Sequence, residues 1–158
     1  MQLKLFICFF FLLIGLFNSQ KKQQPMKDCL CYTVIDSTFS KPYYNPSNSL
    51  FIKSKKPSVF SVSNGIVSKI IRNGDLYSLI IKNENLFYIY SNIVSIPKSI
   101  IVGKYIKKRN LIGKGNLLTN EYSIELQIYN KTDLLSNVQE YIQCKKIFVT
   151  QSLPTFSQ

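Results

Sequence analysis

The sequence has no histidine among its 158 residues. Histidine is the usual general base near neutral pH and the commonest metal ligand, so its absence excludes histidine-dependent and histidine–zinc catalysis. Acidic residues are also scarce, with 8 Asp and Glu against 20 Lys and Arg and a formal net charge of +12. Such a surface attracts polyanions. The densest basic runs, Lys53–Lys56 and Lys107–Arg109, are typical of turns and carry no interleaved aromatic residues. We therefore expect a solvated lysine surface and no nucleic-acid partner.

Two further motifs are missing. The glycines around Gly113-Lys114-Gly115 do not have the spacing of a phosphate-binding loop, and no helical pattern follows them, which argues against nucleotide binding. Cys8 lies inside an apolar run with no small-residue lipobox, so the sequence does not predict a lipoprotein. We expect no cofactor.

The first residues have the pattern of an export signal. Lys4 precedes an apolar run from Leu5 to Phe17, which ends at the polar residues Asn18-Ser19-Gln20. The run is shorter than the roughly 20 apolar residues of a membrane-spanning helix. We expect residues 1–19 to be a signal peptide cleaved near Ser19, with an uncleaved anchor as the alternative. The mature chain would be periplasmic or secreted, without a stable membrane span.

Three cysteines follow the predicted signal: Cys29, Cys31 and Cys144. In an oxidising compartment, a disulfide from Cys29 or Cys31 to Cys144 would close a loop of over a hundred residues, and such a bond contributes about 4 kcal/mol. The odd count leaves one thiol unpaired. Zinc binding by Cys29-x-Cys31 is the alternative, but this is not the usual Cys-x-x-Cys spacing and no second pair follows.

Short β-rich segments separated by turn residues dominate the chain. Residues 20–46 contain scattered prolines and predict a linker and N-terminal extension. Strands are predicted over the ranges 50–52, 58–62, 65–71, 76–81 and 86–90, with turns at Asn64-Gly65 and at residues 72–75 and 82–85. This rhythm is typical of a mainly β domain, an antiparallel sandwich or barrel.

The C-terminal third contains the clearest strand. Residues 122–129 alternate, so that Ile124, Leu126 and Ile128 point to one side while Ser123, Glu125 and Gln127 point to the other. Apolar residues at helical spacing then predict one short helix over residues 133–142. Residues 146–158 are expected to be a C-terminal tail.

The order of these segments resembles the lysostaphin/LytM-type cell-wall metallopeptidases, whose fold is of the duplicated-hybrid-motif type. The family's strand ending in an Asp-Gly turn is similar to Val59–Val67, and its Tyr-x-His-Leu box to Tyr90–Ile93. Its glycine-containing run is similar to Val102–Gly113, and its final His-x-His strand to Ser123–Ile128. The resemblance implies a LytM-like domain over residues 47–145.

The resemblance also implies where a catalytic site would lie. The three zinc-ligand positions of the family correspond here to Ser47, Phe51 and Glu125, and its two assisting histidines to Asn92 and Ser123. Phenylalanine cannot coordinate a metal, and one carboxylate cannot replace three ligands. We expect no metal and no catalytic residues. Glu125 as a lone general base is the alternative to a solvated strand residue.

A LytM-like domain without its ligands is expected to be a pseudoenzyme. The resemblance suggests that its groove binds peptidoglycan, or that it regulates a cell-wall amidase, as inactive LytM domains do. Tyr88 and Tyr90 would then stack on sugars if their rings line the groove. Two alternatives remain: a structural or protein-interaction module of the cell envelope on the same β scaffold, and a peptidase whose metal site is relocated to Cys29, Cys31 or Asp36 beside Glu125.

Overall fold

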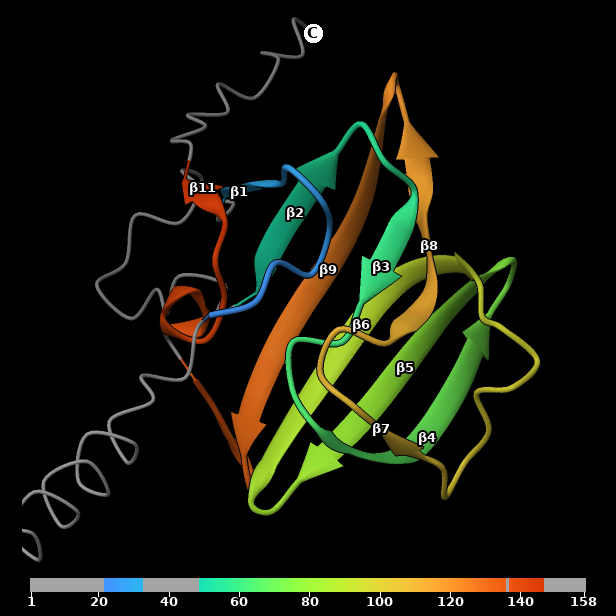
Figure 1. Ribbon diagram of the computed structural model, residues 1–158, viewed down its shortest axis with the longest axis vertical. Coiled ribbons are helices and arrows are strands. Elements are labelled where there is room, and N and C mark those ends of the chain that lie inside the picture. Colours follow the sequence, from blue (N-terminus) through green and yellow to red (C-terminus); the bar gives the residue numbers. More distant parts are fainter. Residues whose placement is uncertain (1–21, 33–48, 136, 147–158) are drawn as a thin grey trace, which may run out of the picture.

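A computed structural model describes residues 22–32, 49–135 and 137–146 of the chain (Figure 1). These residues form eleven strands and a single turn of 3-10 helix: β1 (Leu30–Tyr32), β2 (Leu50–Ser54), β3 (Ser58–Phe60), β4 (Gly65–Asn73), β5 (Leu76–Asn83), β6 (Leu86–Ser95), β7 (Tyr105–Ile106), β8 (Leu111–Leu118), β9 (Glu121–Asn130), β10 (Asp133–Leu134), η1 (Val138–Glu140) and β11 (Lys145–Lys146). No helix in these ranges has the length and apolar character needed to cross a membrane.

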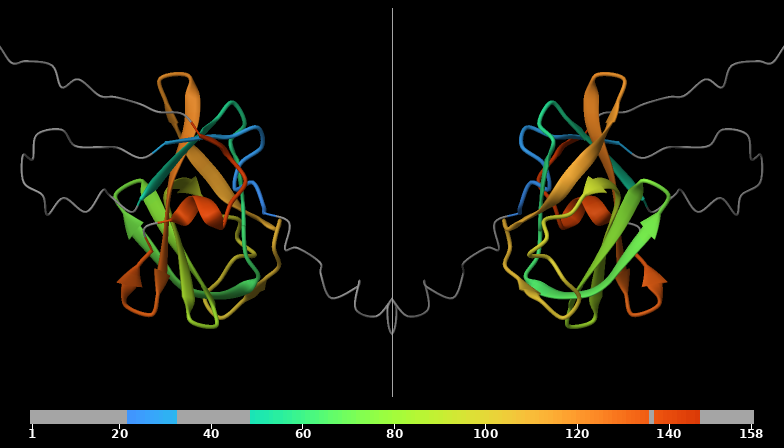
Figure 2. Two further views of the ribbon diagram at one scale, coloured as in Figure 1. Left: turned by 90° about the vertical axis from the view of Figure 1, so that its left-hand side faces the viewer. Right: turned by 90° about the vertical axis from the view of Figure 1, so that its right-hand side faces the viewer.

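All the strands belong to one sheet. Its order is β11-β1-β2-β9-β8-β6-β5-β4-β7, with β3 paired to β8 and β10 paired to β9. Every pairing is antiparallel except that of β1 with β11. The predicted antiparallel β class is therefore confirmed, but the described strands form an open sheet where the sequence predicts a sandwich or barrel. Side views show the β8–β9 hairpin projecting beyond the rest of the sheet (Figure 2).

The two central hairpins form where the sequence predicts them. Gly74 and Glu84 have positive φ values of 61° and 53° in the turns between β4, β5 and β6. The Asn64-Gly65 turn does not make a hairpin, because β3 pairs with β8 whereas β4 pairs with β5 and β7. Gly65 is instead a close-approach position, since a Cβ there would lie 2.5 Å from the carbonyl oxygen of Lys82.

Alternating residues build the core on one side of this sheet, which we call the core face. The side chains at its centre are fully buried, and they come from β2, β4, β5, β6 and β9: Leu50, Ile52, Val67, Leu79, Ile81, Tyr90, Ile124, Leu126 and Ile128. Residues from β3, β8 and the loops complete the cluster, among them Val59, Ile112 and Ile100. Burial of this apolar surface is the main driving force for the fold.

Part of the segment predicted as a linker belongs to the fold. Met26 is fully buried and forms an isolated bridge with Val59, and the Phe60 N–H donates to the Pro25 carbonyl at 2.7 Å. Residues 30–32 add β1 to the edge of β2. Prolines rule out a long strand in this segment, but they do not prevent its apolar residues from packing into the core.

The predicted helix over residues 133–142 is wrong. Asp133–Leu134 forms β10 against the end of β9, and only Val138–Glu140 forms a 3-10 turn. Asn137 precedes this turn without a side-chain capping bond. Val138 and Ile142 are nevertheless buried. The spacing of the apolar residues thus reflects their burial in the core. A single 3-10 turn and an extended segment bury these side chains as well as a helix would.

Candidate functional site

The second side of the sheet carries the residues that the sequence places at the former zinc site. Glu125 on β9 lies directly opposite Phe51 on β2 and Ser91 on β6. Because directly paired residues project to the same side, these side chains share one surface with Ser123 and Gln127 on β9 and with Lys53 on β2. Tyr32 on β1 is paired directly with Phe51 and so belongs to the same surface. We call these residues, Tyr32, Phe51, Lys53, Ser91, Ser123, Glu125 and Gln127, the open face.

An aromatic pair forms one part of the open face. The rings of Tyr32 and Phe51 are stacked, with centroids 5.6 Å apart and an interplanar angle of 23°. The Lys53 ammonium lies 5.0 Å from the centroid of the Tyr32 ring, within the range of a cation–π contact. All three side chains are half-buried. The strand register explains the arrangement, because Tyr32 on β1 is paired directly with Phe51.

A short polar network lies beside this pair. The Gln127 amide donates to the Ser49 hydroxyl at 2.6 Å and to the Glu125 carboxylate at 3.2 Å. Gln127 and Glu125 are half-buried and Ser49 is buried. The amide therefore helps to fix the position of the carboxylate on the open face.

Asn92 sits at a break in β6. Residues 86–91 of β6 pair with β9, whereas Ile93 and Ser95 pair with β8. Against β5 the register shifts at the same point, and Asn92 has a positive φ of 64°. Asparagine is one of the few non-glycine residues that readily adopt this conformation. The strand thus has a bulge here, a feature that redirects a side chain.

The remaining position, Ser123, is almost completely buried. It lies opposite Lys53 on β2 and Asn116 on β8, where β9 leaves β8. The structure therefore brings Phe51, Asn92, Ser123 and Glu125 to the junction of β2, β6, β8 and β9. Ser47 lies outside the described residues.

These side chains do not fit a catalytic zinc ion. Phe51 has no donor atom, and Glu125 is the one carboxylate among the four positions. Catalytic zinc sites use three protein ligands drawn from His, Cys, Asp and Glu. Within residues 22–32, 49–135 and 137–146, no group of three or more such side chains is placed to hold a metal ion. No hydrolytic step through zinc can be assigned to the open face.

The predicted groove aromatics lie on the core face. Tyr90 is paired with Leu126 and is fully buried, and Tyr88 is paired with Ile128 and is also buried. The Tyr90 hydroxyl accepts a hydrogen bond from the Val62 N–H at 2.9 Å. Burial raises the pKa of both phenols. Their rings cannot stack on a ligand at Glu125, because strand alternation points them away from it.

The same alternation separates the cysteines from Glu125. Cys31 is paired with Ile52, so its side chain lies on the core side of the sheet, and Cys29 is buried as well. Both lie close to Cys144, and the structure shows no disulfide among these three cysteines. The relocated metal site is thus not assembled from Cys31 and Glu125. Asp36, the third candidate, lies outside the described residues.

A pocket elsewhere on the surface has a volume of about 280 Å³. Its lining comes from the N-terminal segment, β3 and the loop before β8: Gln23, Gln24, Lys27, Phe60 and Arg109. Two of the lining residues are bonded to each other, since the Arg109 guanidinium donates to the Gln23 amide oxygen at 2.6 Å. None of these residues belongs to the open face.

Sequence reasoning missed Tyr32 and Lys53 as members of the site. The alternation of β9 identifies Gln127 beside Glu125, but nothing in the sequence pairs β1 with β2. The short apolar stretch at residues 31–35 indicates a possible strand, but it does not identify the partner of that strand. The contact between the two rings follows only from the register, in which Tyr32 is paired with Phe51.

Comparison with known proteins gives the fold a context. No family model matches the sequence, and no curated protein matches it. Among solved structures, Helicobacter pylori Csd3 is similar, with 22% identity and a TM-score of 0.58 over 77% of this chain. A chain of a SpoIIIAH–SpoIIQ complex is similar as well, with 14% identity and a TM-score of 0.58. The match covers 76% of this chain and 99% of the matched chain.

A catalytic-domain mutant of the prophage-encoded M23 protein EnpA from Enterococcus faecalis is similar too. It has 10% identity and a TM-score of 0.55, over 72% of this chain and 92% of its own. The match to Csd3 spans only 33% of that longer protein. At these identities the likeness establishes the fold alone. The described part of this chain has a LytM-like fold, shared with M23 metallopeptidases.

Proposed function

We propose that the chain is an exported, non-hydrolytic LytM-like domain that binds peptidoglycan through its open face. The observation that carries this proposal is that an aromatic ring, which can contact a bound molecule, stands where the resemblance implies a zinc ligand. Phe51, at a zinc-ligand position of the family, stacks on Tyr32 and lies opposite Glu125. An aromatic pair beside a fixed carboxylate and an ammonium suits a ligand that combines sugar rings with charged peptide groups.

Each group has a counterpart in that polymer. The partly exposed rings of Tyr32 and Phe51 offer an apolar surface to a sugar, as aromatic side chains do at binding sites generally. Lys53 would pair with a stem-peptide carboxylate, and Glu125 with an amino group. The net charge of +12 adds a non-specific attraction to anionic wall polymers, which salt screens.

The test is co-sedimentation with purified peptidoglycan at low and high salt. Tyr32→Ala should weaken binding about tenfold, and the loss should persist at high salt because a ring contact is not screened. Tyr105→Ala is the matched control, since Tyr105 is an exposed tyrosine on β7, away from the open face. Equal binding by wild type and Tyr32→Ala at both salt concentrations would contradict the proposal.

Catalytic inactivity needs its own measurement. Incubating the purified chain with zinc should yield no stoichiometric metal and no release of peptides from cross-linked wall. Bound zinc at one equivalent together with hydrolysis would show that the chain is a peptidase after all, with its ligands drawn from outside the open face.

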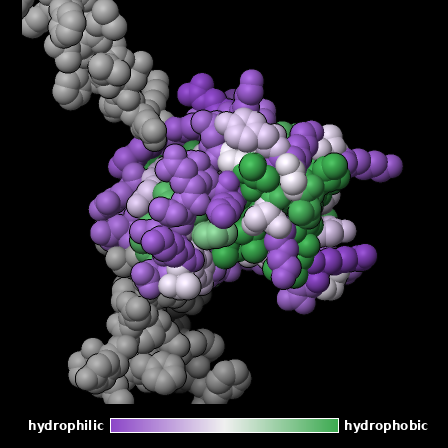
Figure 3. Space-filling view, turned by 90° about the horizontal axis from the view of Figure 1, so that it is seen from below, coloured by the Kyte–Doolittle hydropathy of each residue, from purple (hydrophilic) through white to green (hydrophobic). Residues whose placement is uncertain are grey.

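A second candidate function is protein interaction in the cell envelope, for example with a cell-wall amidase. It is favoured by an exposed apolar cluster formed by Ile66, Ile101, Val102 and Tyr105, each at least half exposed. Ile66 and Tyr105 are directly paired, and the Gly103 N–H donates to Val67 beside them. Apolar atoms gather on one side of the molecule seen from below (Figure 3). SpoIIQ, which shares the fold, was solved in a complex with SpoIIIAH.

The Tyr105→Ala control separates the two functions. If the chain is an interaction module, this variant should lose capture of a purified amidase while Tyr32→Ala retains it. If the open face binds peptidoglycan, Tyr32→Ala should lose binding in the peptidoglycan assay while Tyr105→Ala binds like the wild type.

A further inference from the structure

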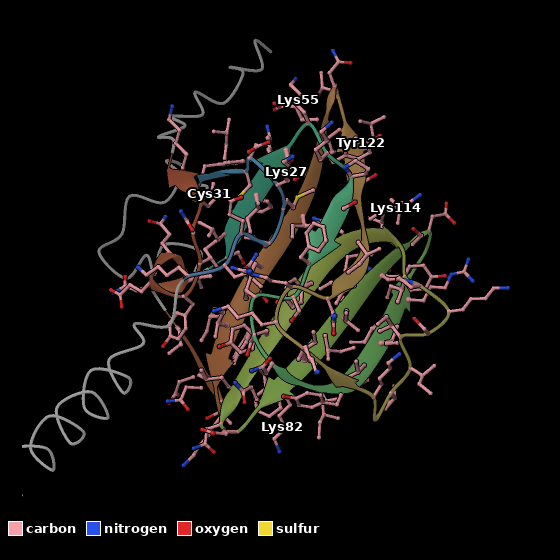
Figure 4. All side chains as sticks on the ribbon, in the orientation of Figure 1. Lys27, Cys31, Lys55, Lys82, Lys114 and Tyr122 are labelled. Carbon is pink, nitrogen blue, oxygen red and sulfur yellow. The ribbon has the colours of Figure 1, made fainter. Side chains whose placement is uncertain are left out.

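Three cysteines that are distant in the sequence meet at one edge of the sheet. β1 and β11 pair in parallel, with Leu30 opposite Lys145 and Cys31 opposite Lys146. The same register continues one step back, because the Lys145 N–H donates to the Cys29 carbonyl at 3.2 Å. Cys29 therefore stands opposite Cys144. Figure 4 shows Cys31 beside β11 at this edge.

We propose that Cys29 and Cys144 are an oxidation site that closes a disulfide between the N-terminal and C-terminal segments, while Cys31 stays a thiol beside it. Neighbouring strands lie about 4.8 Å apart, and disulfides join Cα atoms at roughly 4.4–6.8 Å. Register-matched residues thus satisfy the distance. Cys31 is two residues further along the chain, opposite Lys146, and lies diagonally to Cys144, which makes it the less favourable partner.

Side-chain contacts bring both buried thiols to Cys144, and of its two thiol hydrogen bonds the one with Cys29 has the larger effect on the Cys144 pKa while the one with Cys31 has the smaller. The Cys29 thiol contacts the Gln143 carbonyl oxygen at 3.7 Å, next to Cys144 in the chain. A hydrogen bond from Cys144 lowers the pKa of Cys29, and the same bond raises the pKa of Cys144. This hydrogen bond places the two sulfur atoms in direct contact, as disulfide formation requires.

Exposure sets the order of events. Cys29 and Cys31 are buried, whereas Cys144 is partly exposed. A disulfide-bearing oxidant therefore meets Cys144 first. The Cys144 sulfur bonds to one sulfur of the oxidant, and the other leaves as a thiol. The Cys29 thiolate then attacks the Cys144 sulfur and expels the second half of the oxidant. Two protein thiols are oxidised, one external disulfide is reduced, and the two protons leave with the two released thiols.

The experiment uses the full chain carrying Cys8→Ser, so that three thiols remain. The protein is incubated with oxidised glutathione, denatured, and its free thiols are counted. Tandem mass spectrometry of the non-reduced digest locates the bond, because Cys29 and Cys31 fall in one tryptic peptide. We expect one free thiol, at Cys31, and a Cys29–Cys144 link within one chain. A link at Cys31, a bond between chains, a stable glutathione adduct or three remaining thiols would overturn the proposal.

Variants provide the controls. Cys31→Ser should form the same link and leave no free thiol, whereas Cys144→Ser should keep both of its thiols. Oxidation should raise Tm by about 10 °C in Cys31→Ser, because the bond closes a loop of more than a hundred residues, and should leave Tm of Cys144→Ser unchanged. Since the readouts are thiol count, link position and Tm, this inference stands or falls independently of peptidoglycan binding.

Discussion

The two sides of β9 differ in how strongly the fold restricts the residues that can occupy them. On the core face Ile124, Leu126 and Ile128 are fully buried. On the open face Glu125 and Gln127 are half-buried and hydrogen-bonded to each other. Tight packing constrains the volume and polarity of the first set. The second set is free to change its chemistry without changing the fold, so a LytM-like fold is compatible with Phe51 and Glu125 on its open face.

The largest expected effect comes from the core face. Leu126→Ala should reduce the free energy of unfolding by about 3 kcal/mol, because the lost methyl groups leave a cavity among side chains that cannot fully collapse. Urea denaturation followed by circular dichroism measures this change. A loss below about 1 kcal/mol would mean that the centre of β9 is less tightly packed than its burial indicates.

A smaller effect is expected where the core face contains a polar group. Tyr90→Phe removes the acceptor of the Val62 N–H, a bond of 2.9 Å in a fully buried setting. Leaving that donor unpaired costs about 1–3 kcal/mol. The free energy of unfolding in urea at pH 7 tests this, with Tyr105→Phe as the exposed control. Equal stability of Tyr90→Phe and wild type would mean that the Val62 N–H finds another partner.

The same hydroxyl gives a pH dependence. Burial raises the pKa of Tyr90 above its ordinary value of about 10, so the unfolded chain releases this proton at lower pH than the folded chain does. The stabilisation is complete below pH 10 and is lost as the pH rises further. The stability difference between wild type and Tyr90→Phe should shrink above pH 10. A constant difference up to pH 11 would contradict the assigned burial.

These contrasts explain which features the sequence predicts. Alternation identifies β9, assigns Leu126 and Glu125 to opposite faces, and turn residues place the β4–β5 and β5–β6 hairpins. The sequence does not predict which strands pair outside the hairpins. The pairs β3–β8 and β1–β2 join residues far apart in the chain, and no local pattern encodes them. The failed assignment of Tyr90 to the groove has the same cause: its face depends on its register with Leu126.

The open face should respond weakly to loss of a polar side chain. Gln127→Ala removes the donor to the Ser49 hydroxyl and to Glu125. Because both partners can turn partly to water, the expected loss is about 0.5–1 kcal/mol. Ile128→Ala, the adjacent residue on the core face, is the matched control and should cost several times more. Similar losses for the two variants would remove the distinction between the faces.

The smallest effect is expected at the rim of the sheet, near the β8–β9 hairpin. The Lys55 ammonium lies 3.4 Å from the Glu121 carboxylate, and 72% of the Lys55 side chain is exposed (Figure 4). Water and salt screen such a pair, so Lys55→Ala should change the free energy of unfolding by less than about 1 kcal/mol. Urea titrations at low and high salt measure the change. A larger loss that disappears at high salt would show that this hairpin depends on its ion pair, since apolar burial on the core face is not weakened by screening.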